Sequence, residues 1–111
     1  MSALPMLRRK ADFAAISRAG TARSDRLLVL RALRTDGPVT RIGFSTPRRL
    51  GGSVERNRVR RRLRELMRER YEEIATGWDM LLIARPEAAS ASYAELRQAL
   101  TSLLERSRIT P

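Results

Sequence analysis

Apolar and polar residues alternate in the first half of the chain in a way that predicts two strands. Leu27–Leu33 is rich in apolar residues, and in Arg41–Ser45 the side chains of Ile42 and Phe44 share one face. Such short alternation is typical of half-buried strands. Because the turn signal Asp36-Gly37-Pro38 lies between the two segments, we expect them to form a hairpin.

The first and last helices are predicted by apolar residues at helical spacing. Asp12–Ala19 places Phe13 and Ile16 three residues apart, and Gly20 is a suitable stop. The last helix is expected to start at Ser92-Tyr93-Ala94-Glu95, which matches a capping box. Its apolar residues are Tyr93, Leu96, Leu100, Leu103 and Leu104.

A long amphipathic helix is predicted from Val54 to Ile74, with Gly77 ending it. Its apolar stripe consists of Val59, Leu63, Leu66, Met67 and Ile74. Arg70 also falls within this stripe, and we expect its aliphatic stem to extend outward to water.

The continuous apolar run Met80–Ala84 predicts a central strand buried on both faces. A helix separates this strand from Arg41–Ser45, so the two strands are expected to be parallel neighbours. The fold class that follows is α/β, an α+β sandwich with a small mixed sheet of three to four strands and three helices, in the order α-β-β-α-β-α. At 111 residues, we expect one domain spanning residues 1–111.

Composition excludes several classes of function. The chain has no cysteine and no histidine, so it lacks disulfides, thiolate nucleophiles, the commonest general base and two usual metal ligands. The longest apolar run has five residues, too short to cross a membrane. The first dozen residues carry no apolar signal core. We therefore expect a cytoplasmic protein with no membrane partner.

The net charge of +11 is concentrated in one segment. Residues 41–70 contain eleven arginines and three glutamates, a local net charge of +8. Repulsion between so many like charges costs stability, and the usual reason for a protein to tolerate it is a polyanionic partner. On a helical wheel, one side of the long helix carries only arginines, namely Arg60, Arg61, Arg64 and Arg68. The opposite side mixes Arg58 and Arg62 with Glu65 and Glu69.

Other interpretations of a basic amphipathic helix are a solvated surface, a membrane-surface helix or a partner helix. The apolar stripe is only wide enough to cover a sheet, which disfavours lipid binding. The loop Arg49-Leu-Gly-Gly-Ser-Val54 lacks the Gly-Lys-Ser/Thr ending of a phosphate-binding loop. Charge alone favours nucleic-acid binding.

The sequence from Arg41 to Glu65 closely resembles the signature of the bacterial ribonuclease P protein subunit. It reads RIGFSTPRRLGGSVERNRVRRRLRE, with Arg56-Asn57-Arg58 as the R-N-R core. Arg8-Arg9, Asp12-Phe13 and Gly20 resemble the family's first helix, and Ile83–Pro86 resembles its last strand. The resemblance therefore covers nearly the whole chain in order.

The resemblance implies a small protein cofactor of a ribozyme. In this family the RNA removes the 5′ leader of precursor tRNA by endonucleolytic hydrolysis, with Mg2+ held mainly by the RNA. Implied partners are the catalytic RNA and precursor tRNA, with no small-molecule substrate and no catalytic or metal-binding residue in the protein. The family also implies a left-handed strand–helix–strand crossover. The alternative is a general RNA-binding module such as a ribosomal protein.

Site residues follow from the same resemblance. The RNA-binding set is Arg48, Arg49, Arg56, Asn57, Arg58, Arg60, Arg61, Arg64 and Arg68. Asn57 could instead cap the helix start. Arg62 and Arg70 are expected to be solvated or paired.

A second surface, the leader cleft, is expected at Phe13, Ser17 and Arg31. Phe13 could equally be a core contact between helix and sheet. Ser17 and Arg31 occupy positions where relatives often have aromatic residues. We therefore expect reduced stacking there, with Arg31 offering a guanidinium plane or a phosphate contact.

Overall fold

The computed structural model describes residues 4–109 and shows a four-stranded sheet with helices on both faces. The helices are α1 (Lys10–Ala19), α2 (Ser53–Arg70) and α3 (Tyr93–Arg106). The strands are β1 (Thr21–Ser24), β2 (Leu28–Arg34), β3 (Arg41–Ser45) and β4 (Trp78–Ala84). Three 3-10 turns complete the set: η1 (Arg48–Leu50), η2 (Tyr71–Glu73) and η3 (Pro86–Ser90). The predicted fold class is confirmed, with β1 as an additional strand.

The sheet order is β1-β2-β4-β3, and this order corrects one prediction. The strands β2 and β3 do not form a hairpin, because β4 lies between them, antiparallel to β2 and parallel to β3. The most apolar strand thus takes a central place, where both faces are covered. The connection from β2 to β3 passes over the start of β4, where the Thr35 amide donates to the Gly77 carbonyl at 2.7 Å. The parallel pairing of β3 with β4 was predicted correctly.

The hairpin in this fold joins β1 to β2 instead. Its turn is held by Asp25, whose Oδ1 accepts hydrogen bonds from the amides of Leu27 and Leu28 at 2.8 and 2.9 Å. All four residues of β1 are exposed, so the strand has no apolar alternation that could predict it.

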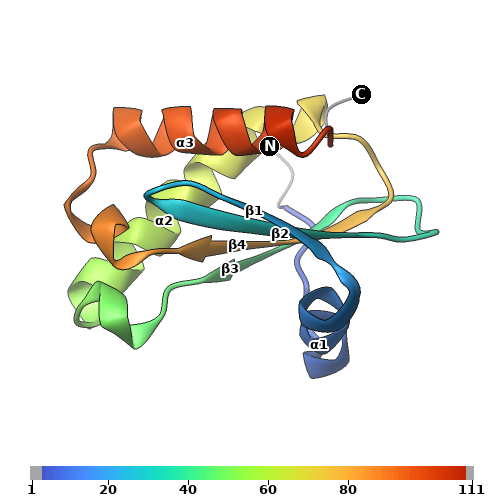
Figure 1. Ribbon diagram of the computed structural model, residues 1–111, viewed down its shortest axis with the longest axis horizontal. Coiled ribbons are helices and arrows are strands. Elements are labelled where there is room, and N and C mark those ends of the chain that lie inside the picture. The colour runs from blue at the N-terminus through green and yellow to red at the C-terminus, as the bar shows by residue number, and fades with distance from the viewer. Residues whose placement is uncertain (1–3, 110–111) are drawn as a thin grey trace.

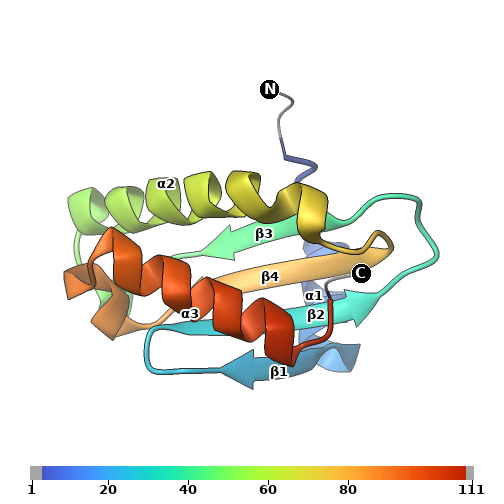
Figure 2. The same cartoon turned by 90° about the horizontal axis from the view of Figure 1, so that it is seen from above.

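The helices α2 and α3 lie side by side over one face of the sheet (Figure 2). The predicted stripe of α2 is confirmed as core, since Val59, Leu63, Leu66 and Met67 are all fully buried. The helix ends at Arg70 rather than Ile74, and η2 follows. Ile74 is buried, but it lies beyond the helix in extended backbone, where the polypeptide turns toward the sheet. Gly77 does not end the helix; it sits at φ +87 in the turn before β4.

The chain from β3 through α2 to β4 forms a left-handed crossover, as the family resemblance implied. Seen from the helix side in Figure 2, β3 and β4 run in the same direction and α2 returns above them. With the strands pointing upward in that view, β4 lies to the left of β3. Right-handed crossovers are the strong general preference.

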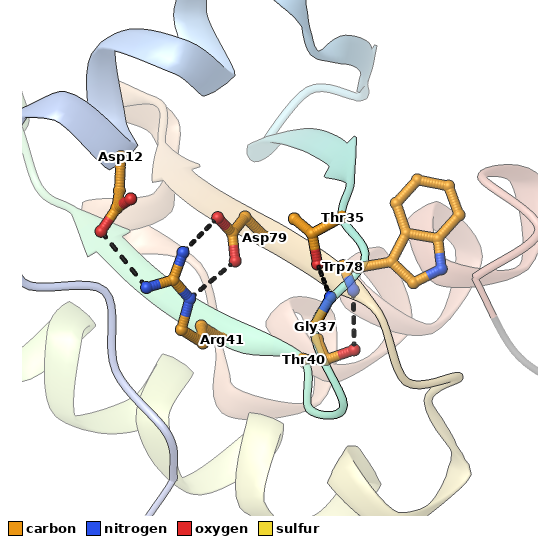
Figure 3. A network of polar contacts seen from close by, with 7 residues as sticks. All are labelled: Asp12, Thr35, Gly37, Thr40, Arg41, Trp78 and Asp79. Atoms are coloured by element: carbon orange, nitrogen blue, oxygen red, sulfur yellow. Dashed lines mark hydrogen bonds and ion pairs between the residues drawn. The ribbon is translucent and has the colours of Figure 1, made fainter.

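Helix α1 packs on the opposite face of the sheet, behind it in Figure 2. A second apolar cluster forms there around Leu7, Ile16 and Leu81. At the edge of this cluster, the guanidinium of Arg41 joins α1 to the sheet (Figure 3). It binds buried Asp79 through two hydrogen bonds of 2.9 and 2.6 Å and Asp12 through one of 3.3 Å. The hydrogen bond to Asp79 is the main cause of the raised pKa of Arg41.

Candidate nucleic-acid interface

The two polar sides of α2 have different surroundings. Arg58 donates to the Ala89 carbonyl at 3.2 Å, and Arg62 donates to the Ala91 carbonyl at 3.3 Å. This side therefore faces the connection that leads from β4 into α3. Arg58 was predicted to belong to the RNA-binding set, but the structure separates it from the other arginines of that set on α2.

The other side of α2 faces β3 and carries Arg60, Arg61, Arg64 and Arg68, here called the arginine flank. Arg60 reaches Thr46 at the end of β3, and the Arg64 guanidinium lies 6.0 Å from the centre of the Phe44 ring. Arg61 and Arg68 are exposed. Within residues 4–109, no carboxylate forms an ion pair with the arginine flank. These guanidinium groups keep their positive charge available for an anionic partner.

The start of α2 adds more positive charge. Arg48 and Arg49 are exposed on η1, directly before the helix, and Arg56 is half-buried in its first turn. Gly51 separates η1 from α2 at φ +147, a backbone conformation that favours glycine. Asn57 is exposed, and its Oδ1 accepts a hydrogen bond of 3.1 Å from Arg60.

Asn57 does not cap the helix. The N-cap residue is Gly52, and no side chain supplies a capping hydrogen bond. The alternative that Asn57 caps the helix start is therefore wrong, and the residue is exposed beside the arginine flank. Arg70 forms an ion pair with Glu73 at 3.5 Å, and Arg62 is hydrogen-bonded, so both residues are paired as expected.

The three residues of the predicted leader cleft lie on the α1 side of the sheet, with Phe13 over β3 and Arg31 on β2 next to Ser17. The Phe13 ring is half-buried and packs so closely on β3 that a Cβ atom at Gly43 would lie 2.8 Å from the ring. Its position fits the core-contact interpretation, while part of the ring stays accessible. Ser17 is exposed one turn later on α1.

Arg31 fastens the end of α1 to the sheet. Its Nη2 donates to the carbonyl oxygens of Ser17 at 2.9 Å and Ile16 at 3.5 Å. A cation at this end of a helix is favourable, because the terminal carbonyl groups carry partial negative charge. The Arg31 Nε is buried without a partner among the described residues. Arg31 thus places a charged group on this face of the sheet and holds the end of α1.

Two structural features of this region carry no sequence signal. The segment before α1 runs along the outer edge of β3, where Met6 pairs with Ile42 in a parallel bridge. Thr46 is buried and contacts Arg60, although nothing in the residues around it distinguishes it from a loop threonine. Both depend on contacts between segments far apart in the chain.

Carboxylates are dispersed rather than grouped. Residues 4–109 contain no group of three or more His, Cys, Asp or Glu side chains placed to hold a metal ion. In the same range, no helix is long and apolar enough to cross a membrane.

A sequence model of the family described as Ribonuclease P matches residues 1–108 of the chain. The chain belongs to the ribonuclease P protein family. The ribonuclease P protein component of Roseiflexus sp. (strain RS-1) is 38% identical over 104 residues, covering 93% of this chain and 85% of that protein. The one from Streptomyces avermitilis is 41% identical over 109 residues, with 90% and 89% covered.

Solved ribonuclease P proteins have the same fold. The protein from Thermotoga maritima gives a TM-score of 0.83 at 26% identity, covering 91% of this chain and 96% of that chain. The Staphylococcus aureus protein gives 0.88 at 24% identity over 96% and 97%, a likeness that shows the fold alone. Membership of this family gives the chain the role of an RNA-binding protein subunit in tRNA processing.

Proposed function

We propose that the arginine flank of α2, with the start of that helix, holds the catalytic RNA of ribonuclease P. The observation that carries this proposal is the row of guanidinium groups beside β3 that has no ion-paired carboxylate within residues 4–109. Guanidinium groups bind phosphate oxygens through paired N–H donors. The contacting residues are Arg48, Arg49, Arg56, Asn57, Arg60, Arg61, Arg64 and Arg68. Arg58 contributes less, because it is hydrogen-bonded to the η3 segment.

The sheet face beside α1 receives the single-stranded 5′ leader of precursor tRNA. Phe13 offers the accessible part of its ring, while Arg31 offers its remaining N–H groups next to Ser17. An aromatic ring and a guanidinium group together suit an unpaired RNA strand, which presents both base faces and phosphates. The two RNA surfaces therefore lie on different parts of the molecule.

The RNA performs the phosphodiester hydrolysis; Mg2+ would be held mainly by RNA ligands, where it would supply the activation of water. The protein contributes binding and orientation: it fastens the RNA along α2 and the substrate leader beside α1. It does not cut RNA alone.

The direct test is reconstitution at low Mg2+ with the cognate catalytic RNA and a precursor tRNA. Wild-type protein should stimulate leader removal, and the triple variant R61Q/R64Q/R68Q should need a higher concentration to do so. Each lost phosphate contact lowers the salt dependence of binding by roughly 0.7 to 0.9 log unit per log unit of salt. Absence of stimulation by the wild-type protein would contradict the proposal.

A matched control is R26Q/R97Q/R106Q, which removes the same charge elsewhere. Arg26 and Arg97 form exposed ion pairs of 3.6 Å with Glu95 and Glu69, and such pairs contribute little stability. This control should keep the wild-type salt dependence. Competition between precursor and mature tRNA for the reconstituted particle then separates the proposed role from general RNA binding, which would show no preference for the leader. RNA cleavage by repurified, RNA-free protein would contradict RNA-borne catalysis.

A further inference from the structure

Three side chains form a continuous polar chain between the end of β3 and the surface of α2. Thr46 directly follows β3 and is only 6% exposed. Its hydroxyl oxygen accepts a hydrogen bond from Arg60 Nη2. Arg60 Nη1 in turn donates to Asn57 Oδ1 at 3.1 Å. This hydrogen-bond chain therefore starts at the buried Thr46 and ends at the exposed amide of Asn57.

The donor groups of Arg60 determine how the Asn57 amide is oriented. A guanidinium group has only donors, so the amide group must turn its oxygen toward Arg60. The NH2 group of Asn57 then points away from Arg60, and Asn57 itself is exposed. Two donor hydrogens are thus presented outward beside the arginine flank.

We infer that Thr46 and Arg60 are positioning residues, which hold the Asn57 amide with its NH2 group toward an oxygen acceptor of the RNA. This inference rests on the proposed function of the arginine flank, and it adds what orients Asn57 and which of its atoms binds. Thr46 is buried and touches no RNA; it acts through Arg60. Arg60 has a double role, because the N–H groups not used in the chain remain free for phosphate.

An ordered donor binds more tightly than a mobile one, since binding then immobilises fewer side-chain rotamers. Removing the Thr46 hydroxyl group should therefore weaken RNA binding without removing any direct contact between protein and RNA. A cost of one immobilised side chain corresponds to a loss of about three- to ten-fold in affinity.

The test compares T46V with T46S in binding of the full-length protein to the catalytic RNA. Valine has nearly the same shape as threonine but no hydroxyl group, whereas serine keeps the hydroxyl group. We expect T46V to bind about three- to ten-fold more weakly, and T46S to bind like the wild type. Equal binding of T46V and the wild type, or equal losses in both variants, would overturn the inference. Thermal melting of both variants shows whether a loss comes from folding.

A second variant tests the hydrogen-bond chain without substituting a buried residue. R60K keeps the charge but replaces the planar fork by an ammonium group that cannot hold both acceptors in the same geometry. We expect R60K to show the affinity loss of T46V with an unchanged salt dependence, because the number of charged contacts is kept. Wild-type affinity in R60K would contradict a positioning role for Arg60.

A double-mutant cycle identifies Asn57 as the residue being positioned. N57A removes the amide, so adding T46V to N57A should cause a smaller loss than T46V causes in the wild type, and the remainder reports the phosphate contact of Arg60 itself. Fully additive losses would mean that Thr46 acts on something other than Asn57 and would overturn the inference.

A measurement on the RNA-free protein separates this inference from the proposed function. The side-chain NH2 group of Asn57 should be rigid in the wild type and in T46S, and mobile on the picosecond-to-nanosecond timescale in T46V by NMR relaxation. A mobile wild-type amide would overturn the inference even if the protein binds its RNA. A rigid amide in a protein that fails to bind the RNA would instead contradict the proposed function.

Discussion

At the residue scale, neighbouring arginines of α2 have different surroundings. Arg61 is exposed on the arginine flank, while Arg62, the next residue, donates a hydrogen bond to the Ala91 carbonyl. Because successive helix positions are rotated by about 100°, adjacent side chains point to different surroundings. Charge count alone cannot separate such residues, but position on the wheel can.

We predict that R61Q lowers the slope of RNA affinity against salt by roughly 0.7 to 0.9 log unit, whereas R62Q changes it much less. Both variants lose one positive charge, so a difference between them reports position rather than net charge. Filter-binding titrations over a series of salt concentrations measure the slopes. Equal slopes in the two variants would argue against α2 presenting one preferred side to the RNA.

At the element scale, α2 combines a core face and a basic face on one helix. Val59, Leu63, Leu66 and Met67 are fully buried against the sheet and α3, and the arginine flank borders them. The helix is therefore fixed by apolar packing, while its charged groups are left to act on a partner. Stability and binding should respond to different residues of the same element.

We predict that L63A lowers the free energy of unfolding by about 2–5 kcal/mol, because it leaves a cavity at a fully buried position. V54A is the matched control on the same helix, since Val54 is 72% exposed, and it should change stability by less than about 0.5 kcal/mol. Urea unfolding followed by circular dichroism measures both values. Similar losses in the two variants would mean that the stripe is not what anchors the helix.

The start of α3 gives a prediction about pH. The Glu95 carboxylate accepts the Ser92 amide at 2.8 Å and completes the capping box, which holds the pKa of Glu95 below its ordinary value of 4.5. The charged carboxylate therefore stabilises the fold at pH values above the ordinary pKa. This contribution is lost as the pH falls through the lower pKa of the folded state.

E95Q keeps a capping acceptor but cannot titrate. The difference in melting temperature between the wild type and E95Q should therefore shrink as the pH is lowered from about 6 to about 3. Differential scanning fluorimetry across this range measures the difference. A constant difference would show that the cap does not depend on the charge of Glu95.

At the scale of the whole molecule, the sheet separates the two proposed RNA surfaces. Helices α2 and α3 cover one face, and α1 covers part of the other face (Figure 1). Arg41 and Arg31 hold α1 to the sheet near its two ends, through Asp12 and through the carbonyl groups of the last turn. RNA assembly and leader recognition should therefore be separable by mutation.

We predict that R31Q reduces the preference of the reconstituted particle for precursor over mature tRNA, while assembly with the catalytic RNA stays unchanged. Loss of Arg31 removes both its charge and the hydrogen bonds that it donates to the Ile16 and Ser17 carbonyl groups at the end of α1. R18Q removes an exposed arginine of α1, next to Ser17, and is the control for loss of charge. A weaker assembly of R31Q with the RNA, or an equal effect of R18Q, would argue against a separate leader surface.

The sequence by itself determined the elements with strong periodicity and the identity of the charged side of α2. The stripe of α2, the capping box of α3 and the apolar strand β4 depend on local spacing, and each was predicted from residues close together in the chain. The resemblance around Arg56-Asn57-Arg58 also pointed to the family that the comparisons established.

Only the tertiary structure decided the order of the strands, the existence of β1 and the internal partners of the arginines. The position of β4 between β2 and β3 depends on which faces are buried after the chain has folded, and a short turn signal such as Asp36-Gly37-Pro38 does not contain that information. The contact of Arg60 with Thr46 joins two elements, and so does that of Arg31 with Ser17. Local spacing sets which way a side chain leaves its own element, but the group it meets there is fixed by long-range packing.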